Sequence, residues 1–577
     1  MQIEYDSNFP LLVKPSPHVF LQQQLCVMYF HLVRTHDINV VLKIGKHFEM
    51  LIEYIQLNMK EGNQQDFLFY LASFYKMIGQ TRDIVNGKGE RDLTYMMICV
   101  FYKYYPYLAS VALRLIFEKD YGCWADFKYF CHFVLHHFPS CSNLISVSID
   151  IAVYQLDKDR YNWDNALYKY FRDCYGEPKK SFERPDGRLH MSLVAKWIPR
   201  ESSKYSWLYE RIVSKWSLIH SPFLFENVKD CEHYTCIMRK CKMEFRRILS
   251  SMNRELDTAQ IKQCENKWVD IYPEKVPMHC LLKQQGSYLG NTKPCKEDSS
   301  QNFKNYFYFG EPGSKFREKY KKTSHMDVGY FVKQARYLLK QVLTENVLCQ
   351  MHFLDRAWRD NVYKQRKCVS KYGGKIRNEN MLPIVDISFD LDMESQNNAI
   401  GMGILISQMS PLNRILFTEH SMTTLEVKDS LEKGFMDIIR EIMDIMKNTM
   451  TFQLESAMKT LGEAKYLFGE PTYLIVLSSN SHLYEFLNIE CSFCSLVFWN
   501  VGTYSLDYEL IDFDIPSNIL YLSGTSPILI HKLQQENFGN NQFQLISHLL
   551  NTDRYDAFSQ CIYNAFYSQT IYTNQCY

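Results

Sequence analysis

The pattern of apolar residues changes once along this chain, near residue 380, and this change constrains the fold more than any other feature. From about residue 17 to residue 360, apolar residues recur at three- and four-residue spacing, the period of an amphipathic helix. Beyond residue 380, apolar runs of strand length, such as Tyr473 to Leu477, alternate with helical patterns. The sequence therefore predicts an all-α helical array over residues 1–380 and a doubly wound α/β domain over residues 381–577.

Short connections join the predicted helices, so each pair needs its neighbours to cover its apolar face, as in an α-solenoid or a ring-like array. A polar, basic stretch near residues 281–322 interrupts the pattern and is predicted to be an inserted surface loop. Residues 371–380 form a second polar junction, where we place the domain boundary. Residues 540–577 are predicted to be helical and to dock on the preceding domain or on the array.

The net charge of +1 conceals a strong asymmetry between the two parts. Residues 1–380 carry 56 Lys and Arg against 41 Asp and Glu, whereas residues 381–577 carry 9 against 23. A basic part raises the local concentration of polyanions, so nucleic acid is the first partner to consider. The alternative is that the two parts attract each other and neutralise both fields within the protein.

Basic residues with aromatic residues between them are the candidates for an RNA-binding surface. Cations neutralise phosphates, and neighbouring aromatic rings stack on unpaired bases. The alternative is a solvated helix face whose aromatic residues belong to the core. No base-reading motif accompanies these residues, so RNA would be recognised by shape and charge. The candidate RNA-binding residues are Lys88, Arg91, Lys196, Arg200, Lys204, Arg239, Lys242, Arg246, Arg247 and Arg254.

The motif Asp386-Ile-Ser388-Phe-Asp390 follows the first predicted strand of the α/β domain. It resembles the metal ion-dependent adhesion site (MIDAS) of von Willebrand factor A (vWA) domains, in which a carboxylate and two hydroxyl groups bind Mg²⁺. Here Asp390 replaces the second Ser of the family, and Met450 stands at the position of the family's Thr, which Thr449 or Thr451 matches only after a one-residue shift. A later strand leads into Asn480 where the family has an Asp. We therefore interpret the motif as a degenerate MIDAS and expect no metal, with bound Mg²⁺ as the alternative.

Several further segments match one known family together. The matching segments are Thr81 to Leu93, Gly122 to Asp126, Lys196 to Glu201, Leu382 to Ser388, Phe498 to Asn500 and Leu522 to Pro527. On these segments, the chain resembles a family of unknown function found in giant viruses, plants and fungi, and the viral members look most similar. That family pairs a TROVE-like helical array with a vWA-like domain, the architecture of the Ro ribonucleoprotein autoantigen. The resemblance implies a HEAT-like helical ring that binds the ends or helices of non-coding RNA.

No catalytic constellation is recognised in the sequence. The turn around Lys88 lacks the glycine and lysine spacing of a phosphate-binding loop, and the His residues lack a nucleophile motif. We therefore expect no enzyme activity and no cofactor. The sequence contains 18 Cys, which are interpreted as buried free thiols, and neither a signal peptide nor a transmembrane segment is recognised. These features predict a cytoplasmic protein, or one of the host cytoplasm if the chain is viral.

Three functional hypotheses follow from the sequence. The first is a non-enzymatic, Ro-like RNA-binding scaffold whose vWA-like domain contacts a protein partner. The second is a protein-interaction or virion-associated scaffold without RNA, in which the opposite charges of the two parts serve docking. The third is a metal-dependent vWA adhesion module, against which Asp390 and Asn480 count.

Overall fold

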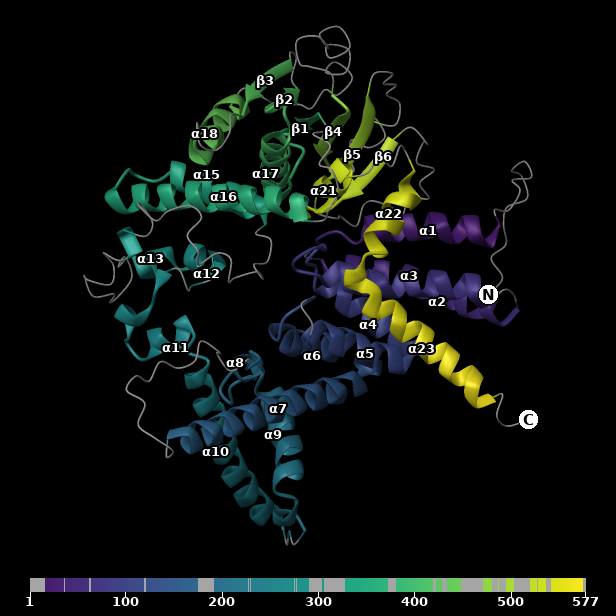
Figure 1. Ribbon diagram of the computed structural model, residues 1–577, viewed down its shortest axis with the longest axis vertical. Coiled ribbons are helices and arrows are strands. Elements are labelled where there is room, and N and C mark those ends of the chain that lie inside the picture. Colours follow the sequence, from purple (N-terminus) through teal and green to yellow (C-terminus); the bar gives the residue numbers. More distant parts are fainter. Residues whose placement is uncertain are drawn as a thin grey trace.

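The computed structural model consists of an array of α-helices followed by a mixed α/β domain, which confirms the predicted change of architecture (Figure 1). The structure describes residues 16–35, 37–61, 64–118, 121–174, 191–226, 228, 230–273, 276, 278–289, 303–305, 327–371, 380–418, 422–427, 433–447, 471–479, 486, 494–502, 519–526, 528–535 and 541–573. Among these residues, no helix combines the length and the apolar character needed to cross a membrane.

Fifteen helices of the array are described before the sheet begins, and several start at a side-chain cap. The carboxylates of Asp230 and Asp327 accept hydrogen bonds from backbone amides at the starts of α10 and α15. Pro17 occupies the first turn of α1, where its missing N–H costs nothing. The helices are α1 (Pro17–His31), α2 (Ile38–Glu61), α3 (Gln64–Arg82), α4 (Asp92–Tyr104), α5 (Pro106–Glu118), α6 (Ala125–His137), α7 (Asn143–Cys174), α8 (Val194–Trp197), α9 (Ser206–His220), α10 (Cys231–Glu255), α11 (Ala259–Cys264), α12 (Met278–Lys283), α13 (Gln285–Tyr288), α15 (Val328–Leu339) and α16 (Glu345–Lys371).

The array follows an arc rather than a straight stack. Helices α1 to α6 pack together, α7, α9 and α10 continue from them, and α11 to α13 lead back towards α15 and α16 beside the sheet (Figure 1). The start of the predicted insertion differs from the expectation, because residues 281–289 belong to α12, α13 and the turns beside them. Leu281, Leu282 and Tyr288 of this segment are buried. Most of the remaining insertion lies outside the described residues.

The α/β domain contains one six-stranded sheet among the described residues, with the order β3-β2-β1-β4-β5-β6. Five strands are parallel, and β3 pairs with β2 in the antiparallel sense at the edge. Strands β1, β4 and β6 are buried along their whole length, as expected for a sheet covered on both faces. The elements are β1 (Met381–Val385), α17 (Met393–Met409), β2 (Arg414–Thr418), β3 (Met422–Glu426), α18 (Phe435–Met446), β4 (Tyr473–Ser478), β5 (Ser495–Asn500), β6 (Ile519–Ser523), α21 (Ile528–Gln535), α22 (Gln542–Leu550) and α23 (Asp556–Thr573).

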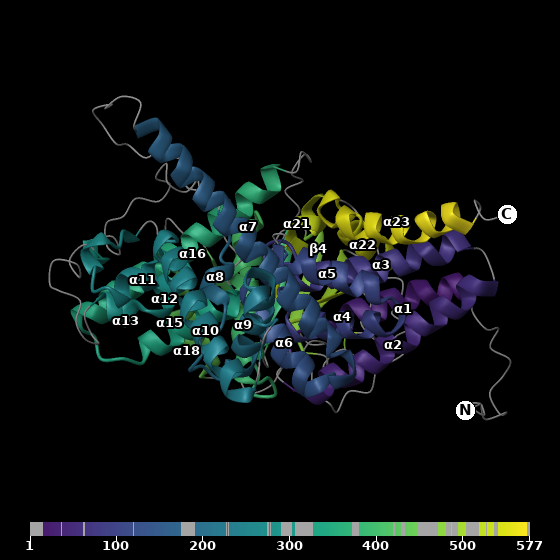
Figure 2. The same ribbon diagram turned by 90° about the horizontal axis from the view of Figure 1, so that it is seen from below.

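The α/β domain contacts both ends of the arc. At the end of the arc, α15 packs on α17, and α16 packs on α18 and α21. At its beginning, α1 contacts β6 and α22, and α23 lies alongside α3 in both views (Figure 1 and Figure 2). Arg34, which follows α1, forms ion pairs with Glu90 and with Asp327, so it links the beginning of the array to the cap of α15. The arc is therefore closed through the sheet domain.

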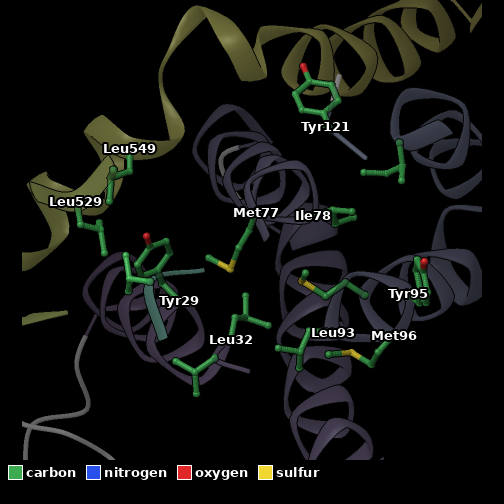
Figure 3. Close-up of a cluster of buried hydrophobic side chains, with 14 of the residues drawn as sticks. Tyr29, Leu32, Met77, Ile78, Leu93, Tyr95, Met96, Tyr121, Leu529 and Leu549 are labelled. Atoms are coloured by element: carbon green, nitrogen blue, oxygen red, sulfur yellow. The ribbon is translucent and has the colours of Figure 1, made fainter. Parts of the chain in front are cut away.

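The C-terminal helices dock on the array, as the sequence predicts. The guanidinium group of Arg554 forms a bidentate ion pair with Asp83, which is fully buried, and the Tyr555 hydroxyl donates to the same carboxylate at 3.0 Å. One continuous apolar core runs through both parts. Figure 3 shows a part of this core in which Leu529 and Leu549 of the α/β domain face Tyr29 of the array.

Candidate nucleic-acid interface

Four predicted cations lie on neighbouring elements of the array. Arg91 precedes α4, Lys196 lies in α8, and Arg200 and Lys204 lie in the turns between α8 and α9. Lys128 of α6, which the sequence analysis did not select, lies among them. We call these five cations, together with the rings of Tyr129, Trp197 and Tyr205, the basic–aromatic surface.

Aromatic rings lie beside four of these five cations, namely Arg91, Lys128, Lys196 and Lys204. The Lys128 ammonium lies 4.6 Å from the ring centroid of Trp197 and 5.1 Å from that of Tyr129. The Arg91 guanidinium lies 4.7 Å from the Tyr129 centroid, and the Lys204 ammonium lies 5.0 Å from that of Tyr205. A cation over a ring gains about 0.5–1 kcal/mol at an exposed site. The ring face restrains the cation but leaves its N–H groups able to bind an anion.

Among the described residues, no ion pair neutralises the charges of this surface. Arg91, Arg200 and Lys204 are exposed, and Lys128 is half-buried. None of these four cations has a carboxylate partner within the part of the chain that the structure describes. Lys196 donates to Gln260 Oε1 at 3.1 Å, and burial lowers the pKa of its ammonium group. The surface therefore presents positive charge next to the half-buried rings of Tyr129 and Trp197, whereas Tyr205 is buried beneath Lys204. Cations beside accessible rings suit a phosphate backbone with unpaired bases.

Histidines at the end of α6 border the basic–aromatic surface. The rings of His132 and Tyr205 lie 5.5 Å apart, and those of His132 and His136 lie 4.3 Å apart. Burial lowers the pKa of His132, with smaller contributions from His136 and Lys204, so this ring is mainly neutral at pH 7. His132 therefore adds ring area rather than charge to the surface at that pH.

The predicted cations of α10 fall into two groups. Lys242 pairs with Glu210 at 2.5 Å and with Glu201 at 3.5 Å, and Arg246 pairs with Glu201 at 3.2 Å. The hydrogen bond to Glu210 is the main cause that raises the pKa of Lys242. These two cations are therefore compensated by carboxylates of α9 and the turn before it. The remaining candidates on this helix are exposed and have no ion pair among the described residues: Arg239, Arg247 and Arg254.

Lys88 differs from the other candidates because it lies inside the protein. Its ammonium group donates to the carbonyl oxygen of Tyr29, lies 3.8 Å from the centroid of the Tyr29 ring, and reaches Ser523 Oγ at 3.4 Å. The side chain is 9% exposed, and burial lowers its pKa to about 7. Ser523 ends β6, so Lys88 joins the array to the carboxyl edge of the sheet. This corrects the expectation of a surface cation, since a buried ammonium that contacts the sheet has no room for a phosphate.

The degenerate MIDAS motif places Asp386 and Ser388 together, both fully buried. Asp386 Oδ2 accepts a hydrogen bond from Ser478 Oγ at 2.5 Å, and Oδ1 accepts one from the Ser388 amide at 2.9 Å. The Ser388 hydroxyl has no hydrogen-bond partner among the described residues. Asp390, by contrast, is exposed. Thr449 and Asn480 lie outside the described residues.

These groups are a poor match to Mg²⁺ by themselves. The buried residues supply one carboxylate and two hydroxyl groups, whereas Mg²⁺ requires six oxygen ligands in near-ideal octahedral geometry. Both oxygens of Asp386 already accept hydrogen bonds from the protein. Within the described parts of the chain, no cluster of three or more His, Cys, Asp or Glu side chains is arranged to hold a metal ion. No chemical step is therefore assigned to a metal.

Comparison with known proteins found no relative: no family model, no curated protein and no solved structure matches the chain. The TROVE-like and vWA-like resemblance therefore stays a prediction. The basic–aromatic surface combines three elements that are distant in sequence, namely the residue before α4, α6 and the segment from α8 to α9. Sequence spacing could not select Lys128 and Tyr129, because their neighbours on the surface come from other elements.

Proposed function

We propose that the protein is a non-enzymatic RNA-binding scaffold of the Ro type, in which the basic–aromatic surface binds the RNA. The observation that carries the proposal is a set of cations that lie on aromatic rings and lack carboxylate partners among the described residues. In this proposal the array is TROVE-like and HEAT-like, and the α/β domain is vWA-like and contacts a protein partner. The strand order with its single antiparallel edge strand supports a doubly wound domain of this kind.

The contacts between the two parts favour this function over a scaffold whose opposite charges serve docking. In that alternative, basic residues of the array would pair with acidic residues of the α/β domain. Among the ion pairs described, the one that joins the two parts has the reverse arrangement. Its basic residue, Arg554, belongs to the α/β domain, and its acidic residue, Asp83, belongs to the array. Other contacts described there are apolar or use neutral partners, such as Lys88 with Ser523, although Lys76 and Arg34 of the array also attract Asp556 and Glu394 of the α/β domain. Among the described contacts, the cations of the basic–aromatic surface take no part in joining the two parts, so in this proposal they bind an external polyanion.

Fluorescence anisotropy with a labelled single-stranded RNA of about 20 nucleotides tests the proposal. The test variant carries Arg91→Glu, Arg200→Glu and Lys204→Glu, three exposed positions without ion pairs among the described residues. If these cations contact three phosphates, the slope of log affinity against log salt becomes shallower by about 2. The matched control carries three reversals at exposed cations in α2, in α15 and directly after α15: Lys46→Glu, Lys333→Glu and Lys340→Glu.

A second variant separates stacking from charge. Trp197→Leu removes a half-buried ring but no charge, and Lys128 keeps the ring of Tyr129 beside it. We expect a loss of about 1–3 kcal/mol in RNA affinity with an unchanged salt slope, because base stacking does not release counterions. The proposal is wrong if the wild-type protein binds no RNA at low salt, or if the two triple variants lose the same affinity.

A further inference from the structure

Helices α9 and α10 form a hairpin at the end of the molecule farthest from the sheet (Figure 1). One face of α10 is buried against α9, where the Phe245 ring lies 5.3 Å from that of Trp216 and 6.1 Å from that of Tyr209. Ile237 and Cys241 lie on the same buried face. Helix α8 also contacts α10, and the side chains on the face opposite Phe245 are exposed.

That opposite face has the spacing of a helix–helix seam. Glu232, Cys236, Arg239 and Met243 follow one another at intervals of four, three and four residues, so they line up along one side of the helix. All four side chains are exposed, and Met243 is 44% exposed. An apolar residue and a cysteine thus alternate with two opposite charges along this seam.

The two charges of the seam cannot satisfy each other within one chain. Glu232 and Arg239 are seven residues apart, which corresponds to about 10 Å along the helix axis. Neither residue has an ion pair within the described ranges. Within the described part of the chain, no intramolecular ion pair therefore competes with a second molecule for these two charges. An acidic residue and a basic residue on either side of a central position form a pattern that is complementary to itself after a two-fold rotation.

We propose that two copies of this chain associate through this seam, with their α10 helices antiparallel and Cys236 next to the two-fold axis. Glu232 of each copy then lies opposite Arg239 of the other, so the contact contains two equivalent ion pairs. The same register places Met243 beyond the two ion pairs, towards the start of α10 in the second copy. Arg239 contacts the second copy in this arrangement and is removed from the candidate RNA contacts.

A contact between two such hairpins is small, so the dimer is weak. A few helical turns on each side fall at the low end of specific interface areas, and such interfaces give micromolar dissociation constants. Charge complementarity then contributes more to orientation and specificity than to affinity. This inference does not depend on the proposed RNA binding, because the seam and the basic–aromatic surface involve different residues.

Sedimentation velocity of the full-length protein without RNA, from about 1 to 100 µM, tests the inference. The wild type is expected to shift from monomer to dimer within this range. Glu232→Arg or Arg239→Glu alone replaces both ion pairs with like-charge contacts, and each should weaken the dimer on the order of tenfold. The combined variant restores opposite charges across the seam and should recover the wild-type constant. Arg254→Glu is the matched control, because Arg254 lies on the same exposed side of α10 but outside the part that contacts the second copy. It should leave the dissociation constant of the dimer unchanged.

Chemical cross-linking gives an independent measurement. A short bis-maleimide should link two copies through Cys236, so the linked dimer disappears in Cys236→Ser and persists in Cys231→Ser, where another exposed thiol of the same helix is removed. The inference is overturned by a protein that stays monomeric over the whole range. The inference is also overturned if neither single charge reversal changes the dissociation constant of the dimer. It is overturned as well if the combined variant does not recover the wild-type constant.

Discussion

The docking of α23 on the array depends on Phe558, whose replacement by Ala gives the most direct test of how the two parts are held together. Phe558 is fully buried, and its ring centroid lies 5.2 Å from those of both Tyr75 and Tyr121. The ring also lies over Gly79 of α3, where an added Cβ would stand 2.4 Å from Phe558 Cε2. A residue larger than glycine therefore cannot occupy position 79 without displacing the ring.

Phe558→Ala should lower the free energy of unfolding by about 3–5 kcal/mol, because it removes a buried ring and leaves a cavity. The estimate includes the two ring contacts, each of which contributes about 0.5–1.5 kcal/mol beyond area burial. Gly79→Ala should destabilise by about 1–3 kcal/mol through overpacking, despite the better helix propensity of alanine. Gln560→Ala, at an exposed position of the same helix, is the control and should stay within about 0.5 kcal/mol of wild type.

Guanidinium unfolding followed by tryptophan fluorescence measures these differences, and hydrogen exchange locates them. Since one apolar core runs through both parts, we expect a single transition for the wild type and lost amide protection in α23 for Phe558→Ala. A destabilisation below about 1 kcal/mol, comparable to that of an ordinary surface substitution, would refute the reasoning. Unchanged protection of the α23 amides would refute it as well.

Two further predictions concern buried polar groups. Burial lowers the pKa of Lys88 from 10.5 to about 7, so between these values the unfolded chain binds more protons and the free energy of unfolding rises with pH. Lys88→Met should abolish this contribution, and denaturation at pH 7 and at pH 9.5 measures it; an identical pH dependence in both proteins would contradict the assignment. Asp386→Ala should lower the free energy of unfolding by about 1–3 kcal/mol, because it leaves the hydroxyl of Ser478 and the amide of Ser388 without their acceptor. Thermal melting should show the same loss with and without Mg²⁺, whereas a wild-type melting temperature that rises with Mg²⁺ would show that the site binds the ion.

Hydrophobic periodicity predicted the α/β domain closely, except at one edge. The predicted strand at Tyr473 to Leu477 coincides with β4, but β3 was not predicted. Of the described side chains in β3, Leu425 is buried, whereas Thr424 and Glu426 are exposed. An edge strand of five residues with few buried side chains gives too weak a signal, because its stability comes from backbone pairing with β2.

The candidate site was predicted only in part, because charge can be read from sequence but its compensation cannot. Arg91 and Lys204 are exposed, as a phosphate contact requires, and each lies beside an aromatic ring. Lys242 is neutralised by Glu210, which is 32 residues away, and Lys88 is buried against a strand that is 435 residues away. Lys128 was missed for the converse reason, since the ring that supports it, that of Trp197, belongs to α8.

The sequence by itself determined where helices and strands form, since the period of the apolar residues specifies which face each element must bury. It also determined that the chain is basic before residue 380 and acidic after it. Tertiary structure alone decided which charges remain free, because a lysine is buried, paired or exposed according to the elements that fold against it. It also decided that α15, α22 and α23 join the sheet domain to both ends of the arc, since such contacts depend on apolar surfaces that meet only in the folded chain.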